Sequence, residues 1–262
     1  MFSKHEFPFL EKNENGMTSK ERTHRTRPEL RRDGLFEMTR FQIQLISDLN
    51  CPWCYLGKKS LDRAIETYKD QHPDAEFDII WRPYYLYPDA KPSGYTKKEY
   101  FAAKFGPAGL PGFFSRVEAG GRALGIDFDF AGRTGTTRDS HKLLLLAQRR
   151  GSPGVVARLQ DALFGGQFEG AGRDISDRAF LAQAAVASGL ARSEEEAWRC
   201  LDSEGAGREA DGSDREAKRM GVTAVPSYLV QGRYRVGGFQ EPEFLVGLFE
   251  KIGAAESSPR SE

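Results

Sequence analysis

The chain contains little cysteine for its length: 262 residues hold three, Cys51, Cys54 and Cys200. Three thiols cannot form an even disulfide framework, which excludes the class of small secreted proteins stapled by disulfides. A second CxxC or a paired histidine motif is also missing, and this disfavours a tetrahedral zinc site. We therefore expect no metal, and a reducing compartment, the cytoplasm, in which the one close cysteine pair is reactive.

Net charge and long apolar runs are missing as well. The 38 basic residues balance the 38 acidic ones, so the sequence has no electrostatic footprint for nucleic acid or an anionic membrane surface. No apolar run approaches the roughly 20 residues that span a bilayer. With 39% hydrophobic and 11% aromatic residues, the chain can bury a core in one domain or two closely joined ones. Nothing in it indicates an oligomeric state.

The two close cysteines enclose Pro52 and Trp53, and they lie between a predicted strand and a predicted helix. Residues 41–45 alternate apolar and polar side chains, whereas residues 55–68 place apolar side chains at helical spacing. The motif thus falls in the first turn of the helix, where unpaired backbone N–H groups and the helix dipole favour an anion. We predict that Cys51 is the nucleophile, partly thiolate near neutral pH, and that Cys54 attacks the mixed disulfide that Cys51 forms.

Two structural interpretations compete with this one. A purely structural disulfide between Cys51 and Cys54 would close a very short loop and remove little chain entropy. An inert buried pair is disfavoured because the preceding segment, residues 47–50, is largely polar and such a helix start is seldom fully covered.

A second element lies far downstream, where Val225 and Pro226 lead into a short β-rich run. Gln231 and Gly232 separate this run from another, which predicts a hairpin. Proline is tolerated at a strand entry because it need not donate to the ladder, and only an X-Pro bond forms the cis peptide cheaply. Alone, this segment predicts an ordinary trans proline at a strand edge. Its combination with the CxxC changes that expectation.

Together these elements resemble the thioredoxin superfamily, and specifically the FrnE-like group of DsbA family oxidoreductases. The resemblance implies a thioredoxin-like α/β fold, a central mixed sheet flanked by helices, with a large inserted helical domain. It also implies that Pro226 is cis, that Val225 and Pro226 flank Cys51, and that the Val225 backbone pairs with an extended substrate. The residues that carry it, in the order of the family, are 47–57, 81–86, 139–143, 172–177 and 225–226.

The activity implied is that of a thiol-disulfide oxidoreductase acting on thiol or disulfide substrates, with no cofactor except possible use of glutathione as co-substrate. One alternative is a glutathione-dependent isomerase or transferase of the kappa or hydroxychromene-carboxylate isomerase type. These branches place serine where Cys51 stands, which argues against them. The other alternative is a non-catalytic, chaperone-like binding protein. Some FrnE-like members have a second cysteine pair, but here only Cys200 remains, and we expect it to be a buried structural thiol.

The order of predicted elements divides the chain into a split thioredoxin-like domain, residues 39–95 and 221–253, and an inserted all-helical domain, residues 96–220. Residues 77–81 form a second strand, parallel to the first. Ser176 and Ser193 are predicted to cap two of the inserted helices, and a last helix covers residues 242–252. The helices predicted within the insertion are 97–105, 113–124, 138–150, 153–168, 177–188, 194–201 and 208–220.

Both ends of the chain have a different composition. Residues 1–38 are rich in charge and poor in apolar periodicity, so we predict a disordered tail, and Met38 is a possible start of the functional protein. Apolar signal features are missing there, and its acidic residues disfavour a mitochondrial presequence. Residues 254–262 are predicted to form a loose tail.

Three further residues are candidates for the site. His141 matches a histidine of the family's insertion and is either a substrate contact or a satisfied structural group. Trp53 is either a hydrophobic lid beside Cys51 or a substrate contact. Asp48 could transfer protons to Cys54 or only pair with a nearby backbone N–H.

Overall fold

The alternation of residues 41–45 produces the central strand of the sheet. The computed structural model describes residues 40–92, 94–170 and 172–257; the expectations for residues 1–38, including Met38, lie outside this range. In β1 (Arg40–Ser47), the side chains of Phe41, Ile43 and Leu45 are buried while Gln42 is exposed. β1 pairs in parallel with β2 (Glu76–Pro83), as predicted, with Phe41 opposite Phe77.

The other side of β1 is occupied by the predicted hairpin. β5 (Ser227–Val230) pairs antiparallel with β1 and with β6 (Tyr234–Gly237), which gives the mixed strand order β2-β1-β5-β6. Gln231 and Gly232 have φ angles of 53° and 65° at the turn. Such angles suit the tight turns that join twisted antiparallel strands. This places Pro226 directly before the strand next to β1.

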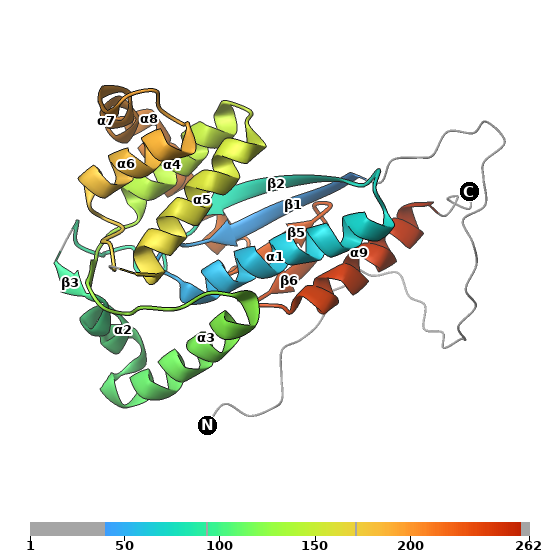
Figure 1. Ribbon diagram of the computed structural model, residues 1–262, viewed down its shortest axis with the longest axis horizontal. Coiled ribbons are helices and arrows are strands. Elements are labelled where there is room, and N and C mark those ends of the chain that lie inside the picture. Colours follow the sequence, from blue (N-terminus) through green and yellow to red (C-terminus); the bar gives the residue numbers. More distant parts are fainter. Residues whose placement is uncertain (1–39, 93, 171, 258–262) are drawn as a thin grey trace.

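Two helices cover one face of the sheet (Figure 1). α1 (Pro52–Gln71) connects β1 to β2, and α9 (Pro242–Ser257) packs beside it. Phe41, Tyr68, Phe77 and Phe249 form an aromatic cluster between them, with ring centroids 4.8–5.8 Å apart. α9 continues beyond 252 to residue 257, so the predicted loose tail is wrong for residues 254–257, and residues 258–262 lie outside the described range.

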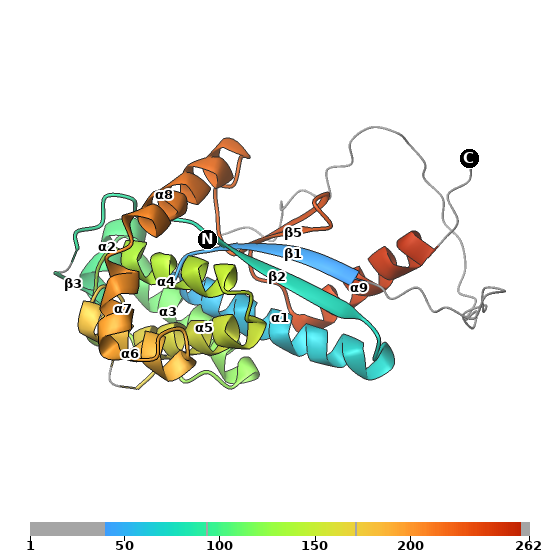
Figure 2. The same ribbon diagram turned by 90° about the horizontal axis from the view of Figure 1, so that it is seen from above.

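The helices of the insertion lie at the end of the sheet where β1 leads into the first turn of α1 (Figure 1). α8 lies across β2, on the opposite side of the sheet from α1 (Figure 2). Three predicted ranges, those of α2, α5 and α7, agree with the structure, and the others shift at one or both ends. The helices are α2 (Lys97–Phe105), η1 (Pro107–Gly109), α3 (Leu110–Leu124), α4 (Arg138–Arg149), α5 (Pro153–Phe168), α6 (Arg178–Ser188), α7 (Glu194–Leu201) and α8 (Glu204–Arg219).

Capping explains two of the shifted helix starts. Asp177, not Ser176, caps α6, because its carboxylate accepts a hydrogen bond from the Ala179 amide at 2.9 Å. α8 starts at Glu204, four residues before the predicted start, because the Ser203 hydroxyl accepts a hydrogen bond from the Ala206 amide. The prediction of Ser193 as the cap of α7 is confirmed.

Between α3 and α4, where no helix was predicted, the insertion contains a short strand besides its helices. Gly125, with φ of 76°, ends α3, and the chain then runs as an extended segment to Thr137. Within it, β4 (Arg133–Thr134) pairs with β3 (Tyr95–Thr96). The Asp129 amide donates a hydrogen bond to Phe168 O at 2.6 Å, so this segment is held by backbone bonds to neighbouring elements. Gly132 fits because a Cβ there would lie 2.2 Å from Gly172 O.

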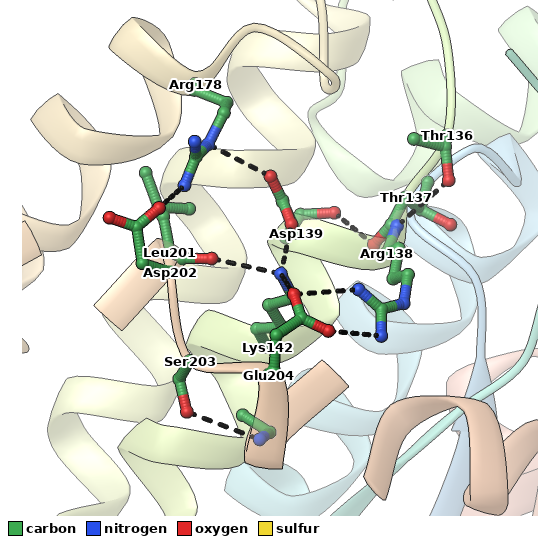
Figure 3. Close-up of polar contacts among 12 residues, drawn as sticks. Thr136, Thr137, Arg138, Asp139, Lys142, Arg178, Leu201, Asp202, Ser203 and Glu204 are labelled. Atoms are coloured by element: carbon green, nitrogen blue, oxygen red, sulfur yellow. Dashed lines mark hydrogen bonds and ion pairs between the residues drawn. The ribbon is translucent and has the colours of Figure 1, made fainter. Parts of the chain in front are cut away.

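A network of ionic groups ties α8 to α4 (Figure 3). The buried ammonium of Lys142 lies 2.7 Å from Asp139 and 3.3 Å from Glu204, and it donates a hydrogen bond to Leu201 O at 3.0 Å. Further along α8, the Asp211 carboxylate lies 3.0 Å from the Arg138 guanidinium of α4. Because α8 leads directly into the segment before Pro226, this network helps to fix the position of that segment.

Candidate active site

Cys51 is the N-cap residue of α1, in the position that the sequence predicts. Its backbone is extended, with φ of −101° and ψ of 110°, and Pro52 occupies the first helical position. The Cys51 carbonyl oxygen accepts hydrogen bonds from the amides of Cys54 and Tyr55, at 2.9 and 3.2 Å. Proline at this position suits a helix start, since its missing N–H would have no partner there. Within the described residues no side chain caps the amides of the first turn, so these amides can face an anion.

The loop of Val225 and Pro226 faces Cys51 in the structure. The Cys51 Sγ donates a hydrogen bond to Val225 O at 3.6 Å, and the Val225–Pro226 peptide is cis. Pro226 also packs on α1, where a Cβ added to Gly57 would lie 2.8 Å from the proline Cγ. The Pro226 carbonyl accepts a hydrogen bond from the Gly238 amide at 2.8 Å. The predicted meeting of the two sequence elements is therefore present.

Both cysteines of the CxxC are free thiols, and both are buried. Cys51 is 4% exposed and Cys54 is 0% exposed, so Cys51 is the more accessible, but the pair is covered more fully than its polar preceding segment suggests. Burial, followed by contact with Cys51, raises the pKa of Cys54 well above its ordinary value, and Ser47 and the Asp48 backbone oppose this rise. Cys54 consequently keeps its proton at neutral pH.

Asp48 is buried beside the motif and accepts several hydrogen bonds. Its Oδ1 accepts from the Asn50 amide at 3.2 Å and from the Thr137 hydroxyl at 2.8 Å, and its Oδ2 accepts from the Leu86 amide at 2.7 Å. The carboxylate therefore fixes three chain segments around the motif. Of the two roles considered from sequence, pairing with backbone amides is the one that these contacts support.

His141 is buried between Trp81 and Asp48. Its side chain is fully buried; the Trp81 indole donates a hydrogen bond to its Nδ1 at 3.2 Å, and its Nε2 lies 3.6 Å from Asp48 Oδ1. These contacts are those of a structural group, although Nε2 has no hydrogen-bond partner among the described residues; a role of His141 as a substrate contact stays a prediction. Because the indole can only donate, Nδ1 must be unprotonated, so the ring proton is on Nε2 and faces Asp48.

Trp53 and Cys200 have different environments. The Trp53 ring is partly buried and packs on Phe239 with ring centroids 5.9 Å apart. Gly238, the residue before Phe239, donates a hydrogen bond to Pro226 O. Trp53 therefore packs next to the loop that faces Cys51. Cys200 is buried in α7, with the Arg150 guanidinium 3.8 Å from its sulfur, and burial raises its pKa. It matches the expected structural thiol.

Sequence reasoning missed a buried polar cluster that joins the insertion to the motif. Asn50 Oδ1 accepts hydrogen bonds from Thr134 Oγ1 at 2.7 Å and from Gln167 Nε2 at 2.9 Å, and Asn50 Nδ2 donates to Gly135 O at 2.7 Å. Tyr100 of α2 is also buried against this region. Asn50, Thr134 and Gln167 are far apart in the sequence and follow no periodic pattern, so the sequence did not predict that they are in contact.

A family model, the DSBA-like thioredoxin domain, matches residues 42–250. The chain belongs to this family. The DSBA-like family match covers both halves of the sheet and the whole insertion between them, which confirms the predicted fold and makes the protein a disulfide oxidoreductase by family. Among curated proteins, no sequence matches the chain.

Solved structures resemble this DSBA-like chain over most of its length. A "probable DsbA oxidoreductase" from Streptomyces coelicolor is 26% identical, with a TM-score of 0.71 over 85% of this chain and 93% of that one. Two others share the fold at 16% identity: the cytosolic disulfide reductase DsbM from Pseudomonas aeruginosa with GSH (TM-score 0.54; 82% and 98% covered) and 2-hydroxychromene-2-carboxylate isomerase (0.57; 83% and 100%).

Two further types of site were considered in the described residues. No helix there is long and apolar enough to cross a membrane. No group of three or more histidine, cysteine, aspartate or glutamate side chains in that range could hold a metal ion.

Proposed function

We propose that the protein transfers electrons between thiols and disulfides through Cys51 and Cys54. One observation carries the proposal: the Cys51 sulfur lies at the start of α1, against the Val225 carbonyl, with the protonated Cys54 one helical turn away. This arrangement gives the two sulfurs different roles, because a nucleophile needs access and an anion-favouring site whereas a resolving thiol needs neither until the mixed disulfide exists.

The proposed reaction has two balanced exchanges. In the first, the Cys51 thiolate attacks one sulfur of a substrate disulfide; a Cys51–substrate bond forms, the substrate S–S bond breaks, and the other substrate sulfur leaves as a thiolate. In the second, Cys54 loses its proton and attacks the Cys51 sulfur; the Cys51–Cys54 bond forms and the second substrate thiolate leaves. Two electrons pass from the dithiol to the substrate. The reverse sequence oxidises a substrate dithiol.

The substrate contacts that we propose are Trp53, Val225 and Pro226. Val225 and Pro226 lie beside the Cys51 sulfur, and the Val225 carbonyl is at hydrogen-bonding distance from it. An extended substrate chain could use that carbonyl once the thiol proton is lost. Trp53, partly exposed and packed on Phe239, would cover the apolar part of such a chain.

Glutathione is a candidate co-substrate because Cys51 is 4% exposed, and a slender thiol reaches a covered sulfur more easily than a folded protein does. We infer a reducing compartment, the cytoplasm, from the shortage of cysteine in the sequence. The alternative of a glutathione-dependent isomerase is supported only by the shared fold. It differs from the proposal because an isomerase would not need Cys54 for turnover.

Three single variants test the proposal. Cys51→Ser should abolish turnover of glutathione disulfide and of a small aromatic disulfide. Cys54→Ser should stop after one exchange and accumulate an adduct with the mass of one glutathione. Cys200→Ser is the matched control, because this thiol is buried outside the motif, and it should cycle like the unaltered protein. Turnover retained by Cys51→Ser would contradict the proposal.

The same variants separate the alternatives. An isomerase that only activates glutathione should keep multiple turnover in Cys54→Ser. A chaperone-like protein should prevent client aggregation in Cys51→Ser as well as the unaltered chain does, while the unaltered chain shows no disulfide turnover.

A further inference from the structure

The insertion forms a hollow that is separate from the residues around Cys51. It has a volume of about 560 Å³ and lies between α2, α3 and the extended segment that follows α3. This volume falls within the range of about 300–1,000 Å³ that is usual for ligand sites. The residues that line it are Thr96, Lys98, Phe114, Glu118 and 128–132.

Aromatic rings form the apolar part of the hollow. Phe114, Phe128 and Phe130 are each partly exposed there, whereas the neighbouring Phe101 and Phe113 are buried. The ring of Phe130 stacks on that of Phe114 with centroids 4.2 Å apart, and on that of Phe128 with centroids 5.6 Å apart. A contiguous group of exposed rings is typical of a surface that binds an apolar group. The hollow therefore favours a ligand with an apolar or aromatic side chain.

The backbone beside these rings has bonded and unbonded amides in alternation. The Asp129 amide donates a hydrogen bond to Phe168 O at 2.6 Å, and the Ala131 amide donates one to the Asp129 carboxylate at 2.7 Å. The backbone N–H and carbonyl groups of Phe128 and Phe130 form no hydrogen bond with a described residue. This alternation is that of a strand at the edge of a sheet, which can pair with another extended chain.

Two charged side chains of the hollow form no ion pair with another residue in the described part of the chain. Lys98 belongs to α2 and is exposed, and Glu118 belongs to α3 and is half-buried. One unpaired charge of each sign is complementary to a ligand that carries both signs. A polypeptide with a basic and an acidic side chain beside an apolar one meets this condition.

The extended segment is joined to the CxxC at two points. The ring of Phe128 packs edge-on against that of Tyr55, the residue after Cys54, with centroids 6.0 Å apart. Further along the segment, Gly135 O accepts a hydrogen bond at 2.7 Å from the side chain of Asn50, the residue before the nucleophile. The segment therefore runs past the first turn of α1, as Figure 1 shows.

These contacts bound the distance between the hollow and Cys51. From Phe130 to Gly135 the chain spans at most about 18 Å, since an extended chain rises by no more than about 3.6 Å per residue. Gly135 is bonded to the residue before Cys51. A bound chain of roughly five to eight residues is thus long enough to reach from the rings to the nucleophile.

We propose that this hollow binds an extended segment of a polypeptide substrate, which pairs with the backbone of Phe128 and Phe130 and places an apolar side chain on the rings. The inference rests on the proposed function, in which the substrate disulfide reaches Cys51. In such strand addition the main chain supplies affinity and the side-chain pocket supplies selectivity. The substrate class is then an unfolded or extended polypeptide with an aromatic side chain about five to eight residues from its cysteine.

The test measures binding in the Cys51→Ser variant, which lacks the nucleophile. The probe is the blocked, cysteine-free peptide acetyl-Lys-Val-Phe-Val-Asp-amide, and amide hydrogen exchange is followed by NMR with and without it. At saturation, exchange at Phe128 and Phe130 should slow at least about tenfold, because their amides become paired. The Asp129 amide is the internal control, since it is already bonded to Phe168 O and should keep its rate. Unchanged exchange at both phenylalanines would overturn the proposal.

Modified peptides separate backbone pairing from apolar contact. One peptide carries N-methyl groups on its two valines and another on its phenylalanine, so that opposite edges of the extended peptide are blocked. One of the two should bind at least about tenfold more weakly than the probe, and the other should bind within about twofold of it. Equal affinity of both would overturn the pairing. Serine in place of the peptide's phenylalanine should also weaken binding about tenfold, through loss of buried apolar area.

Variants of the protein assign the peptide to this hollow. Lys98→Gln and Glu118→Gln, each added to Cys51→Ser, should weaken binding about two- to fivefold, as for loss of an exposed ion pair. Lys104→Gln is the matched control, because Lys104 is an exposed lysine of α2 outside the lining, and it should leave the affinity unchanged. Equal affinity in all three variants would overturn the assignment. Failure of the proposed function is distinguishable, because it would appear as disulfide turnover retained by Cys51→Ser, whereas peptide binding requires no thiol.

Discussion

The Cys51 sulfur and the Val225 carbonyl oxygen, 174 residues apart in the sequence, lie 3.6 Å apart in the structure. Cys51 belongs to the start of α1 and Val225 to the segment between α8 and β5. Their contact depends on how closely α1 approaches the strand that follows Pro226. Gly57, on α1, is the residue that permits this approach.

Gly57→Ala should separate the two elements. The new Cβ would lie 2.5 Å from the Tyr228 hydroxyl and 2.8 Å from Pro226 Cγ, so the backbone of the loop must move. We expect a loss of about 1–3 kcal/mol in the free energy of unfolding, as for other overpacked cores. Disulfide turnover should fall as well, because the Val225 carbonyl moves relative to Cys51. Urea unfolding and turnover of glutathione disulfide measure the two effects.

Gly247→Ala is the control for this substitution. Gly247 lies in α9, and a Cβ there would meet nothing within 4 Å. Alanine should raise the free energy of unfolding by roughly 0.5–1 kcal/mol through helix propensity alone, with turnover unchanged. If both alanine variants stabilise the protein, the close approach at Gly57 is not as tight as the structure has it.

Local patterns predicted the elements that carry the chemistry. The alternation of residues 41–45, the spacing of residues 55–68 and the Gln231-Gly232 turn identified β1, α1 and the hairpin. The extended segment before Thr137 was missed because long-range backbone contacts hold it, and these have no local signature. The early start of α8 was missed because glycines at 205 and 207 lower helix propensity, which tertiary contacts and the Ser203 cap override.

The sequence predicted the parts of the candidate site whose residues are neighbours in the chain. It predicted less well the parts that distant segments bring together. Cys51 and Cys54 follow from spacing, and Pro226 was added by family resemblance. The surroundings of His141 could not be predicted, because its burial depends on Trp81 and Asp48, which come from other parts of the chain.

Asp48→Asn should destabilise the fold at the motif. The carboxylate accepts hydrogen bonds on both oxygens, and an amide would turn an NH2 group toward at least one of these donors. A loss of about 2–3 kcal/mol in the free energy of unfolding is expected for a charged hydrogen bond replaced by a clash of donors. Urea unfolding at pH 7 is the measurement. Asp70→Asn, at an exposed position of α1, should change it by less than about 0.5 kcal/mol; equal effects of the two variants would contradict the role of Asp48.

Lys97→Met should stabilise the protein at neutral pH. The Lys97 side chain is fully buried, its Nζ donates one hydrogen bond to Ala131 O at 2.8 Å, and no carboxylate of a described residue forms an ion pair with it. Burial lowers its pKa from 10.5 to about 8. Below pH 8 the folded state therefore holds a charge that the unfolded state solvates better. We expect the variant to gain about 1–3 kcal/mol in the free energy of unfolding at pH 7.

The advantage of Lys97→Met should disappear as the pH rises. Between about pH 8 and 10.5 the unfolded protein binds more protons at Lys97 than the folded one, so the stability of the unaltered protein rises with pH across this window. The difference between the two proteins should narrow from pH 8 and vanish near pH 10.5. Lys98→Met, at the exposed neighbouring position, should show no pH-dependent difference. A constant difference from pH 7 to 10.5 would mean that Lys97 titrates normally.

Lys142→Met should loosen α8 from α4. The ammonium is buried between Asp139, Glu204 and the Leu201 carbonyl (Figure 3). Its removal leaves the Leu201 carbonyl without this donor, whereas Asp139 and Glu204 keep their ion pairs with Arg178 and Arg138. We expect the free energy of unfolding to fall by about 1–3 kcal/mol, as for the loss of hydrogen bonds to a charged group. Amide hydrogen exchange should increase first in residues 204–219, and disulfide turnover should fall because α8 leads to the Val225 segment.

Arg199→Ala is the control, because it breaks an exposed pair with Glu195 on α7. It should cost about 0–1 kcal/mol and leave exchange in α8 unchanged. Uniform exchange in Lys142→Met would mean that this network does not hold α8 locally.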